Sequence, residues 1–261
     1  MSASPLPTIN RWAVLWGSVA ILMCTGAIYS FSVFAGPLSG ARGWDMPTVM
    51  TAFFINAAIS PVPMILGGYI SDRGGARISI LAGGLMFTGG FMLTGIATTT
   101  TALYLSYGLL AGLGQGLAYS GALSNTLKLF PDRRGQAAGL VTGGMGIAAV
   151  IAAPVADLLI RGHGVAAAFV SMGAGYTVVV LVGWAFIRVA PVGYLPPGWT
   201  PPTGAGGAVN IAWQGMLRTT TFYFIFLMMA LGAFSGLMIA SNASPIGQSM
   251  FGLAAPTAAL F

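Results

Sequence analysis

The stretch "GGYISDRGGARIS", Gly67–Ser79, places three charged residues within six positions of an otherwise apolar region. These residues are Asp72, Arg73 and Arg77. No other charged residue lies between positions 46 and 128, so the stretch separates two long apolar runs. Charged side chains need water or a partner. We therefore expect a short polar turn here, and further apolar segments joined by similar turns along the rest of the chain.

The composition indicates which solvent surrounds those apolar segments. Charged residues make up 5% of the 261 residues, hydrophobic residues make up 56%, and the sequence contains no glutamate. A soluble domain carries about a quarter charged residues. In water this chain would leave a large apolar surface exposed, whereas a lipid bilayer would accommodate it. The composition therefore predicts an integral membrane protein.

The apolar runs have the length of membrane spans. A helix needs about 20 apolar residues to cross the hydrocarbon core, and it satisfies its own backbone hydrogen bonds there. The strands of a membrane barrel would be shorter and would alternate in polarity, which these runs do not. The predicted spans cover residues 12–38, 48–70, 78–97, 102–127, 136–160, 165–187 and 220–241.

The basic residues favour one orientation of these spans. With the N-terminus in the cytoplasm, eight of the ten Lys and Arg residues fall inside, and only Arg42 and Arg161 fall outside. Basic residues are enriched in cytoplasmic loops. We therefore expect a multi-pass protein of the cell (inner) membrane with a cytoplasmic N-terminus. The net charge of +6 follows from this topology, with the lipid bilayer as the partner and no nucleic acid required.

The opening stretch also contains a spaced motif. Gly68, Asp72, Arg73, Gly75 and Arg77 form the pattern G-x-x-x-D-R-x-G-x-R. The glycines permit a tight turn and close approach of helices. The pattern resembles the signature loop of the major facilitator superfamily, at the position between the second and third spans where that family carries it. The resemblance implies a gating role for these five residues, in which Asp72 pairs with an arginine or caps a helix end.

Three further segments narrow the resemblance. They are "LFPDRRGQAAGL" (129–140), "APVGYLPPGW" (190–199) and "GLMIASNASPIGQ" (236–248). All three resemble the oxalate/formate antiporter family, whose members move small carboxylate anions. That resemblance implies twelve spans in two six-helix halves, a substrate site between the halves near the midplane, and transport by alternating access.

The expected fold is therefore all-α and integral to the membrane. It consists of the N-terminal six-helix half of a major facilitator fold plus a seventh helix, in a chain that we expect to be incomplete. The expected divisions are a transmembrane half over 1–188, a cytoplasmic linker over 189–217, and the start of a second half over 218–261, including the onset of an eighth span.

Polar side chains inside the spans are candidates to line a substrate path. In the first span, Ser18, Thr25, Tyr29 and Ser32 are spaced to share one helical face. The candidates for a path are Thr25, Tyr29, Ser32, Asn56, Gln115 and Tyr119. Alternatively, such side chains form hydrogen bonds between helices, each worth about 0.6 kcal/mol. The two tyrosines are the stronger candidates, because a phenol within the membrane needs a partner or water.

Small residues recur every four positions in two places. The first set is Gly108, Gly112, Gly116, Ser120 and Ser124, and the second is Gly135, Gly139 and Gly143. Small residues at this spacing let helices touch backbone to backbone. We therefore predict a close helix contact along each set. At the outer end of the fifth span, Asp157 and Arg161 are four residues apart and are predicted to pair.

No Asp, Glu, Lys, Arg or His lies near the middle of any predicted span. The sequence offers no metal cluster, catalytic triad or pair of carboxylates, so we expect a protein that is not an enzyme and needs no cofactor. A bound carboxylate anion would need positive partners from the second half. We therefore expect that the 261 residues alone do not bind small carboxylates. The rival interpretation is a non-transporting seven-span sensor, or a half-unit that assembles with a partner.

Overall fold

The computed structural model describes residues 9–191, 193–200 and 213–251, with side chains described as far as Gly236. All regular elements in these ranges are helical. The contacts divide the chain into two units, Met1–Gly198 and Trp199–Phe261.

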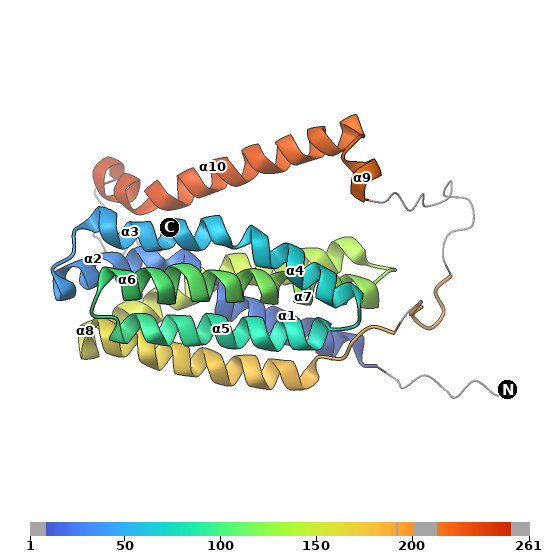
Figure 1. Cartoon of the computed structure of the whole chain (residues 1–261), viewed down its shortest axis with the longest axis horizontal. Helices are drawn as coiled ribbons and strands as arrows, with labels where there is room; N and C mark the ends of the chain where they lie inside the picture. The colour runs from blue at the N-terminus through green and yellow to red at the C-terminus, as the bar shows by residue number, and fades with distance from the viewer. Residues whose placement is uncertain (1–8, 192, 201–212, 252–261) are drawn as a thin grey trace. The chain divides into compact units, whose positions relative to one another are not determined.

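The first unit is a bundle of long helices that lie side by side, parallel or antiparallel to one another (Figure 1). Its elements are α1 (Arg11–Thr25), η1 (Gly26–Ser30), α2 (Phe31–Arg42), α3 (Met46–Ile59), α4 (Pro61–Asp72), α5 (Ala76–Ile96), α6 (Thr100–Leu103), η2 (Tyr104–Ala111), α7 (Gly112–Leu129) and α8 (Arg134–Phe186).

These helices coincide with the predicted spans. Four helical stretches are long and apolar enough to cross a membrane: 11–42, 46–72, 76–96 and 134–186. A further run, α6 with the π-helical η2 and α7, continues from Thr100 to Leu129. The first six predicted spans are thus all helical, with the fifth and sixth joined within α8.

The chain reverses direction within α8. Gly164 has φ 81° and ψ 165°, a conformation that favours glycine. Gly144 before this point and Gly183 after it both lie against α1, next to Val19 and Gly17. Two segments some 20 residues from Gly164 therefore lie at the same level of one helix. The two predicted spans fold back on each other at this glycine.

Local sequence explains where several helices begin and end. The side chain of Asn10 caps α1 by accepting a hydrogen bond from the Ala13 N–H at 3.2 Å. Gly43 ends α2 with φ 68°, the left-handed conformation typical of helix C-termini. Thr99 caps α6 through the Ala102 N–H at 3.1 Å. Pro61 separates α3 from α4, because it lacks the N–H that would continue the helical ladder.

A short 3₁₀ segment, η1, interrupts the first span. Each residue turns by about 120° in a 3₁₀-helix and about 100° in an α-helix, so five residues accumulate an extra rotation of about 100°. Ser18 and Thr25, before or at this segment, are buried, whereas Tyr29 is 44% exposed and Ser32 is exposed. The prediction that these polar residues share one face is therefore wrong, because it assumed uninterrupted α-helical geometry.

The small residues of η2 and α7 do make the predicted close contacts. A Cβ atom on Gly108 would lie 2.8 Å from Ile55 Cγ2, and one on Gly112 would lie 3.1 Å from the Asn56 Cα. A Cβ on Gly116 would collide with the Ser60 carbonyl oxygen. Helix packing in lipid depends on such direct contact, since apolar side chains gain little by leaving lipid.

The second set of small residues, on α8, behaves differently. A Cβ atom on Gly135, Gly139 or Gly143 would have no described atom within 4 Å. The predicted close contact along this set is wrong for the described residues. The spacing correctly identifies a helix face made of small residues. A close contact forms there only if another helix packs against that face.

Aromatic side chains fill one part of the bundle core. Phe34 lies 4.3 Å from Phe169 between ring centroids, and Phe31 lies 4.3 Å from Tyr107. All four rings are at most 1% exposed. They come from α2, η2 and α8, so this cluster joins segments far apart in the sequence. In lipid, such interlocking shapes hold helices together through van der Waals contact.

The second unit contains α9 (Trp213–Met216) and α10 (Thr220–Phe251). Helix α10 includes the seventh predicted span and extends beyond it. Helix α9 lies within the segment 189–217 that we expected to be a linker. The part of α10 whose side chains are described, Thr220–Gly236, is apolar. The expected onset of an eighth span, at 252–261, lies outside the described residues.

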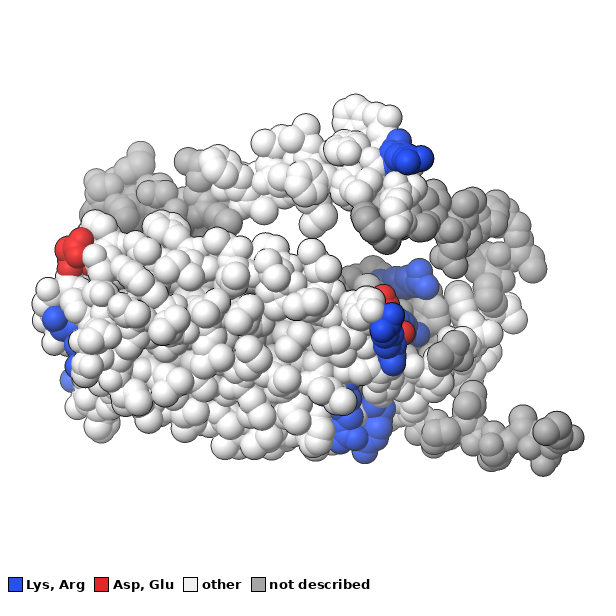
Figure 2. All heavy atoms as spheres, viewed as in Figure 1, with Lys and Arg blue, Asp and Glu red and all other residues white. Residues whose placement is uncertain are grey.

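The charged side chains of the first unit gather at the ends of its helices, as Figure 2 shows for the visible face. The α4–α5 turn and the α7–α8 loop lie at one end, and the α2–α3 turn lies at the other (Figure 1). At the second end Asp157 pairs with Arg161 at 2.9 Å, which confirms the predicted ion pair. The long middle of the bundle is left without charge.

Candidate functional site

The turn between α4 and α5 carries the signature motif, and the residue that makes the turn is Gly74. Its φ of 84° lies in the left-handed region. Gly75, which the motif includes, has φ −86° and donates from its N–H to the Ile70 carbonyl at 2.9 Å. A Cβ atom on Gly75 would lie 2.6 Å from Ile70 Cγ2. Gly74 therefore provides the turn, and Gly75 provides the close approach that lets the chain leave α4.

A similar one-residue offset occurs at the other end of the motif. A Cβ atom on Gly67 would lie 2.9 Å from the Leu117 carbonyl oxygen of α7, whereas one on Gly68 would meet no described atom within 4 Å. The expected helix contact is therefore made by Gly67. One residue corresponds to about 100° around a helix, so Gly68 lies on an open side.

Asp72 pairs with Lys128, in the last turn of α7. The Lys128 ammonium donates to Asp72 Oδ1 at 2.8 Å and to the Ser71 carbonyl oxygen at 3.1 Å. The expected arginine partner is thus replaced by a lysine. The two side chains are 70% and 40% exposed for Asp72 and Lys128. An ion pair this exposed contributes about 0–1 kcal/mol, so the link between α4 and α7 is easily broken.

The two arginines of the motif contact aromatic rings. The Arg73 guanidinium lies 4.1 Å from the ring centroid of Tyr69, one turn earlier in α4. The Arg77 guanidinium lies 4.1 Å from the ring centroid of Trp184, whose Nε1–H donates to the Arg77 carbonyl at 3.0 Å. Arg77 therefore links the start of α5 to the end of α8. Asp72 pairs with Lys128 rather than with Arg77.

A second ion pair joins the start of α1 to the α7–α8 loop. Arg11 Nη1 donates to Asp132 Oδ1 at 2.6 Å, and both side chains are largely buried. Burial disfavours the charged form of Asp132, but the hydrogen bond from Arg11, a backbone hydrogen bond, and the charges of Arg11 and Arg133 outweigh it and hold the pKa of this carboxyl below its ordinary value. Asp132 is thus ionised and engaged at neutral pH.

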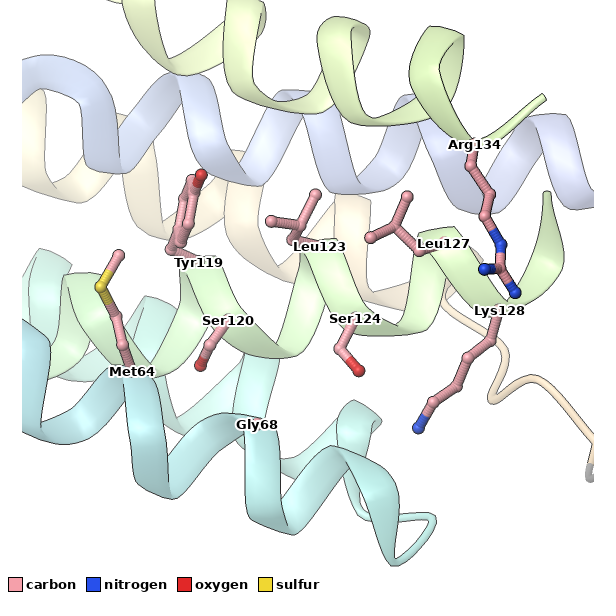
Figure 3. A pocket seen from close by; sticks show the side chains of 9 residues that line it. All are labelled: Met64, Gly68, Tyr119, Ser120, Leu123, Ser124, Leu127, Lys128 and Arg134. Carbon is pink, nitrogen blue, oxygen red and sulfur yellow. The ribbon is translucent and has the colours of Figure 1, made fainter. Parts of the chain in front are cut away.

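A groove of about 450 Å³ lies beside the signature loop, between α4, α7 and the first residue of α8 (Figure 3). Its walls are mostly apolar. It also carries three hydroxyl groups and, at one end, two cationic side chains. The lining residues are Met64, Gly68, Tyr119, Ser120, Leu123, Ser124, Leu127, Lys128 and Arg134.

The structure distributes the path candidates between the core and this open side. Asn56 is fully buried and donates from Nδ2 to the Tyr107 carbonyl at 2.7 Å. Thr25 is also buried, and its hydroxyl donates to the Leu22 carbonyl of its own helix at 3.1 Å. Gln115 is buried, and its Oε1 accepts no hydrogen bond from the described residues. These three lie within the bundle.

Tyr29 and Tyr119 lie on the open side. Tyr29 is 44% exposed, and Tyr119 is half-buried in the groove. Ser32 is exposed on the same span as Tyr29. The two tyrosines that the sequence favoured are thus more accessible than Thr25, Asn56 and Gln115, although the structure does not identify a path.

Most of the groove was not predicted from the sequence. Ser120 and Ser124 were predicted to pack against a neighbouring helix, and Lys128 and Arg134 were counted only among the eight basic residues expected on the cytoplasmic side. The signal was present, because Ser120, Ser124 and Lys128 recur every four residues along α7 and so lie on one side of it. The sequence alone does not reveal that Gly68, on α4, lies across an open groove from these residues.

The family follows from comparison with known proteins. The sequence profile of the Major Facilitator Superfamily matches residues 6–261. The chain belongs to this superfamily. Its membership agrees with the helical bundle, the charge-free interior and the motif turn between α4 and α5. This superfamily member is therefore a multi-pass membrane protein, and the motif that resembles the signature loop lies in its α4–α5 turn.

Several characterised and uncharacterised transporters are similar to this superfamily chain. It is 32% identical to the oxalate:formate antiporter of Oxalobacter formigenes over 94% of this chain and 57% of the relative. It is 26% identical to the uncharacterized MFS-type transporter YhjX of Escherichia coli K12 over 92% of this chain and 59% of that one. It is also 33% identical to human monocarboxylate transporter 12 over 61% of this chain and 31% of that one.

The chain spans a little under three fifths of the length of the first two relatives. All three relatives carry the name of a transporter, in keeping with the expectation of a transport protein rather than an enzyme.

Proposed function

We propose that this chain forms part of a secondary transporter that moves small carboxylate anions by alternating access, as an antiporter. The observation that carries the proposal is the similarity to the oxalate:formate antiporter over 94% of the chain. The similarity to monocarboxylate transporter 12 supports the same substrate class. Because the chain covers 57% of the antiporter, the site for the anion is expected to need a second half.

The proposed organisation follows the predicted divisions: a six-helix half over 1–188, a linker over 189–217 and the start of a second half from 218. The excess of basic side chains at the α4–α5 and α7–α8 end supports a cytoplasmic N-terminus in the cell membrane. A cysteine at Arg133 should be protected from a membrane-impermeant reagent outside cells, and one at Thr98 should react. If the cysteine at position 133 reacts and the one at position 98 is protected, the proposed orientation is wrong.

The open stripe of Gly135, Gly139 and Gly143 supports a second half on this side of the bundle. Such a half could belong to the same polypeptide or to a partner chain, so the half-unit interpretation is retained beside the transporter. Tyr29 and Tyr119, on the open side, are proposed to donate hydrogen bonds to a carboxylate that the second half neutralises. Ser32 and the buried Thr25, Asn56 and Gln115 are proposed to support that path.

The signature loop is proposed to control one end state of the transport cycle. Asp72, held by Lys128 across an exposed ion pair, is the residue whose contacts can change most easily. Gly75, Arg73 and Arg77 are proposed to shape the turn and hold it against α4 and α8, as their contacts suggest, and Gly68 is proposed to keep the adjoining side of α4 open.

A chimera tests this function. Residues 1–217 would be joined to the second half of the Oxalobacter formigenes antiporter and reconstituted in liposomes loaded with formate. We expect uptake of labelled oxalate above that of liposomes holding the second half alone. Tyr29→Phe with Tyr119→Phe should reduce it at least tenfold, the loss expected when hydrogen bonds to a charged group are removed.

Two outcomes would refute the proposal. A chimera that is folded in the membrane and carries no oxalate would favour the sensor interpretation. Uptake that is unchanged by the two tyrosine substitutions would remove the proposed path. The full 261-residue chain, reconstituted alone, serves as the parallel sample and is expected to show no flux.

A further inference from the structure

The groove ends in two cations whose charges are only partly balanced. Lys128 has one acidic partner, Asp72, and both side chains of this pair are well exposed. Arg134 makes no hydrogen bond or ion pair within the described part of the chain. Asp132, two residues before Arg134, is already taken by Arg11 at 2.6 Å. The end of the groove therefore keeps an excess of positive charge.

We propose that this end of the groove is a binding site for small carboxylate anions, in which the anion takes Lys128 from Asp72 and also binds Arg134. The choice of anion rests on the proposed function. The site itself rests on the groove, its two cations and a free hydroxyl. It is a vestibule at the loop end of the bundle, separate from a site near the midplane.

The hydrogen-bonding groups at this end suit a carboxylate. An arginine presents a planar fork of N–H donors that matches a carboxylate, and a lysine presents three donors. The Ser124 hydroxyl, one turn before Lys128, lies on the same side of α7 (Figure 3) and has no hydrogen-bond partner among the described residues. Ser120, by contrast, donates to the Gly116 carbonyl at 3.0 Å. Ser124, Lys128 and Arg134 thus supply donors to one groove, where the acceptors that compete for Lys128 are Asp72 and the Ser71 carbonyl oxygen.

The walls strengthen this arrangement. Met64, Leu123 and Leu127 line the groove, and apolar walls lower the local dielectric, which strengthens attraction between opposite charges. The volume of about 450 Å³ falls within the range of ligand pockets, about 300–1,000 Å³. A small carboxylate fills only part of it, so water accompanies the anion. The opposite wall is Gly68, whose missing side chain keeps the groove open.

The position of the site links it to the signature loop. Asp72 and the anion compete for one ammonium group, so an anion that enters the groove releases the tie between α4 and α7. At its other end the groove reaches Tyr119. The expectation that these 261 residues hold no anion site considered only the middle of the spans. The groove shows cations at a span end that face a cavity.

Equilibrium dialysis with labelled oxalate tests the site on the purified full chain in phosphatidylcholine nanodiscs. We expect saturable binding that weakens at least about tenfold in Lys128→Gln with Arg134→Gln, because charge-assisted hydrogen bonds are lost. The matched control is Arg42→Gln with Arg161→Gln, which removes the same charge at the opposite end of the bundle and should bind as the unaltered chain does. Asp72→Asn should bind more tightly, by about threefold, since it frees Lys128 from an exposed pair.

Several results would overturn the proposal. They are absence of saturable binding, an equal loss in the control pair, or weaker binding in Asp72→Asn. Loss of oxalate binding in nanodiscs that contain phosphatidylglycerol would show that a lipid headgroup occupies the cations, and the site would be a lipid site. Circular dichroism confirms that each variant keeps its helices. If the chain binds oxalate but the chimera carries none, the transport proposal fails and the binding site stands. If the chimera carries oxalate but Lys128→Gln with Arg134→Gln binds as the unaltered chain does, the binding site fails and the transport proposal stands.

Discussion

Two stripes of small residues share the same spacing but differ in what lies in front of them, and only one is covered. Along η2 and α7, Gly108, Gly112 and Gly116 press against α3 and α4, so a single added methyl group has no room. Along the start of α8, Gly135 and Gly139 have open space in front of them. This difference shows that a repeat of small residues identifies a helix face that another helix can approach closely. Which element approaches it is decided elsewhere.

The largest effect is expected on the covered stripe. Gly116→Ala places a methyl group against the Ser60 carbonyl oxygen and 2.7 Å from Pro63 Cγ, where rigid backbone must move. We expect unfolding to become easier by about 2–3 kcal/mol, the cost of overpacking a tight contact. The midpoint of thermal unfolding in detergent measures this. An unchanged midpoint would mean that α4 and α7 are not held in contact there.

The next largest effect is expected at the ion pair between Arg11 and Asp132, at the loop end of the bundle. Asp132→Asn keeps the size of the side chain but removes the charge that binds Arg11, and we expect a loss of about 1–2 kcal/mol, as for a hydrogen bond to a charged group. The pKa of Asp132 is lowered by folding, so its contribution is fully present at neutral pH and is lost as pH falls through the folded pKa.

Unfolding midpoints between pH 7 and pH 3 measure this contribution. The unaltered chain should lose more stability than Asp132→Asn below the ordinary pKa of an aspartate, about 3.9. Parallel curves would show that the pair contributes nothing.

A smaller effect of opposite sign is expected on the open stripe. Gly139→Ala, the matched partner of Gly116→Ala, meets no described atom and replaces a poor helix former with the best one. We expect the first unit to gain up to about 0.8 kcal/mol. In the chimera, Gly139→Leu should reduce oxalate uptake while the protein stays folded, because the second half is proposed to pack there. A destabilised Gly139→Ala chain would show that the stripe is covered within the unit after all.

The smallest change in stability is expected for Asp72→Asn. Its partner Lys128 is well exposed, so the loss should stay below about 1 kcal/mol. The same substitution should nevertheless lower oxalate uptake by the chimera, since the pair is proposed to set an end state of the cycle. A stability loss as large as that of Asp132→Asn would show that Asp72 has a structural role.

The sequence predicted the features that depend on composition and length. The charge-free runs located the spans, because any exposed charge in lipid is costly. The four-residue spacing of Asp157 and Arg161 predicted their ion pair correctly. The resemblance of the turn at Asp72 to a signature loop indicated the correct superfamily, because the motif is a local pattern of residue types and does not depend on how the helices pack.

The features that depend on rotation about a helix axis were predicted less well. Gly67, and not Gly68, makes the close contact with α7, and Gly74, and not Gly75, adopts the left-handed conformation. The partner of Asp72 was a lysine 56 residues away, on a helix whose rotation about its own axis no local pattern reveals. The groove was missed for the same reason, because its residues come from three helices.

The 3₁₀ segment η1 gives the first span a mechanical property of its own. A residue rises about 2.0 Å in a 3₁₀-helix and about 1.5 Å in an α-helix, so conversion of these five residues to α-helix would shorten the span by about 2.5 Å and turn its far half like a screw. Gly26, pressed against the Met145 carbonyl of α8, would hold the near half in place. We hypothesise that such conversion moves Tyr29 relative to Ser18. Spin labels at Ser32 and Trp16 whose separation never changes during substrate exchange would rule it out. If the conversion occurs, a change within five residues carries Tyr29 and the far half of the first span along the membrane normal.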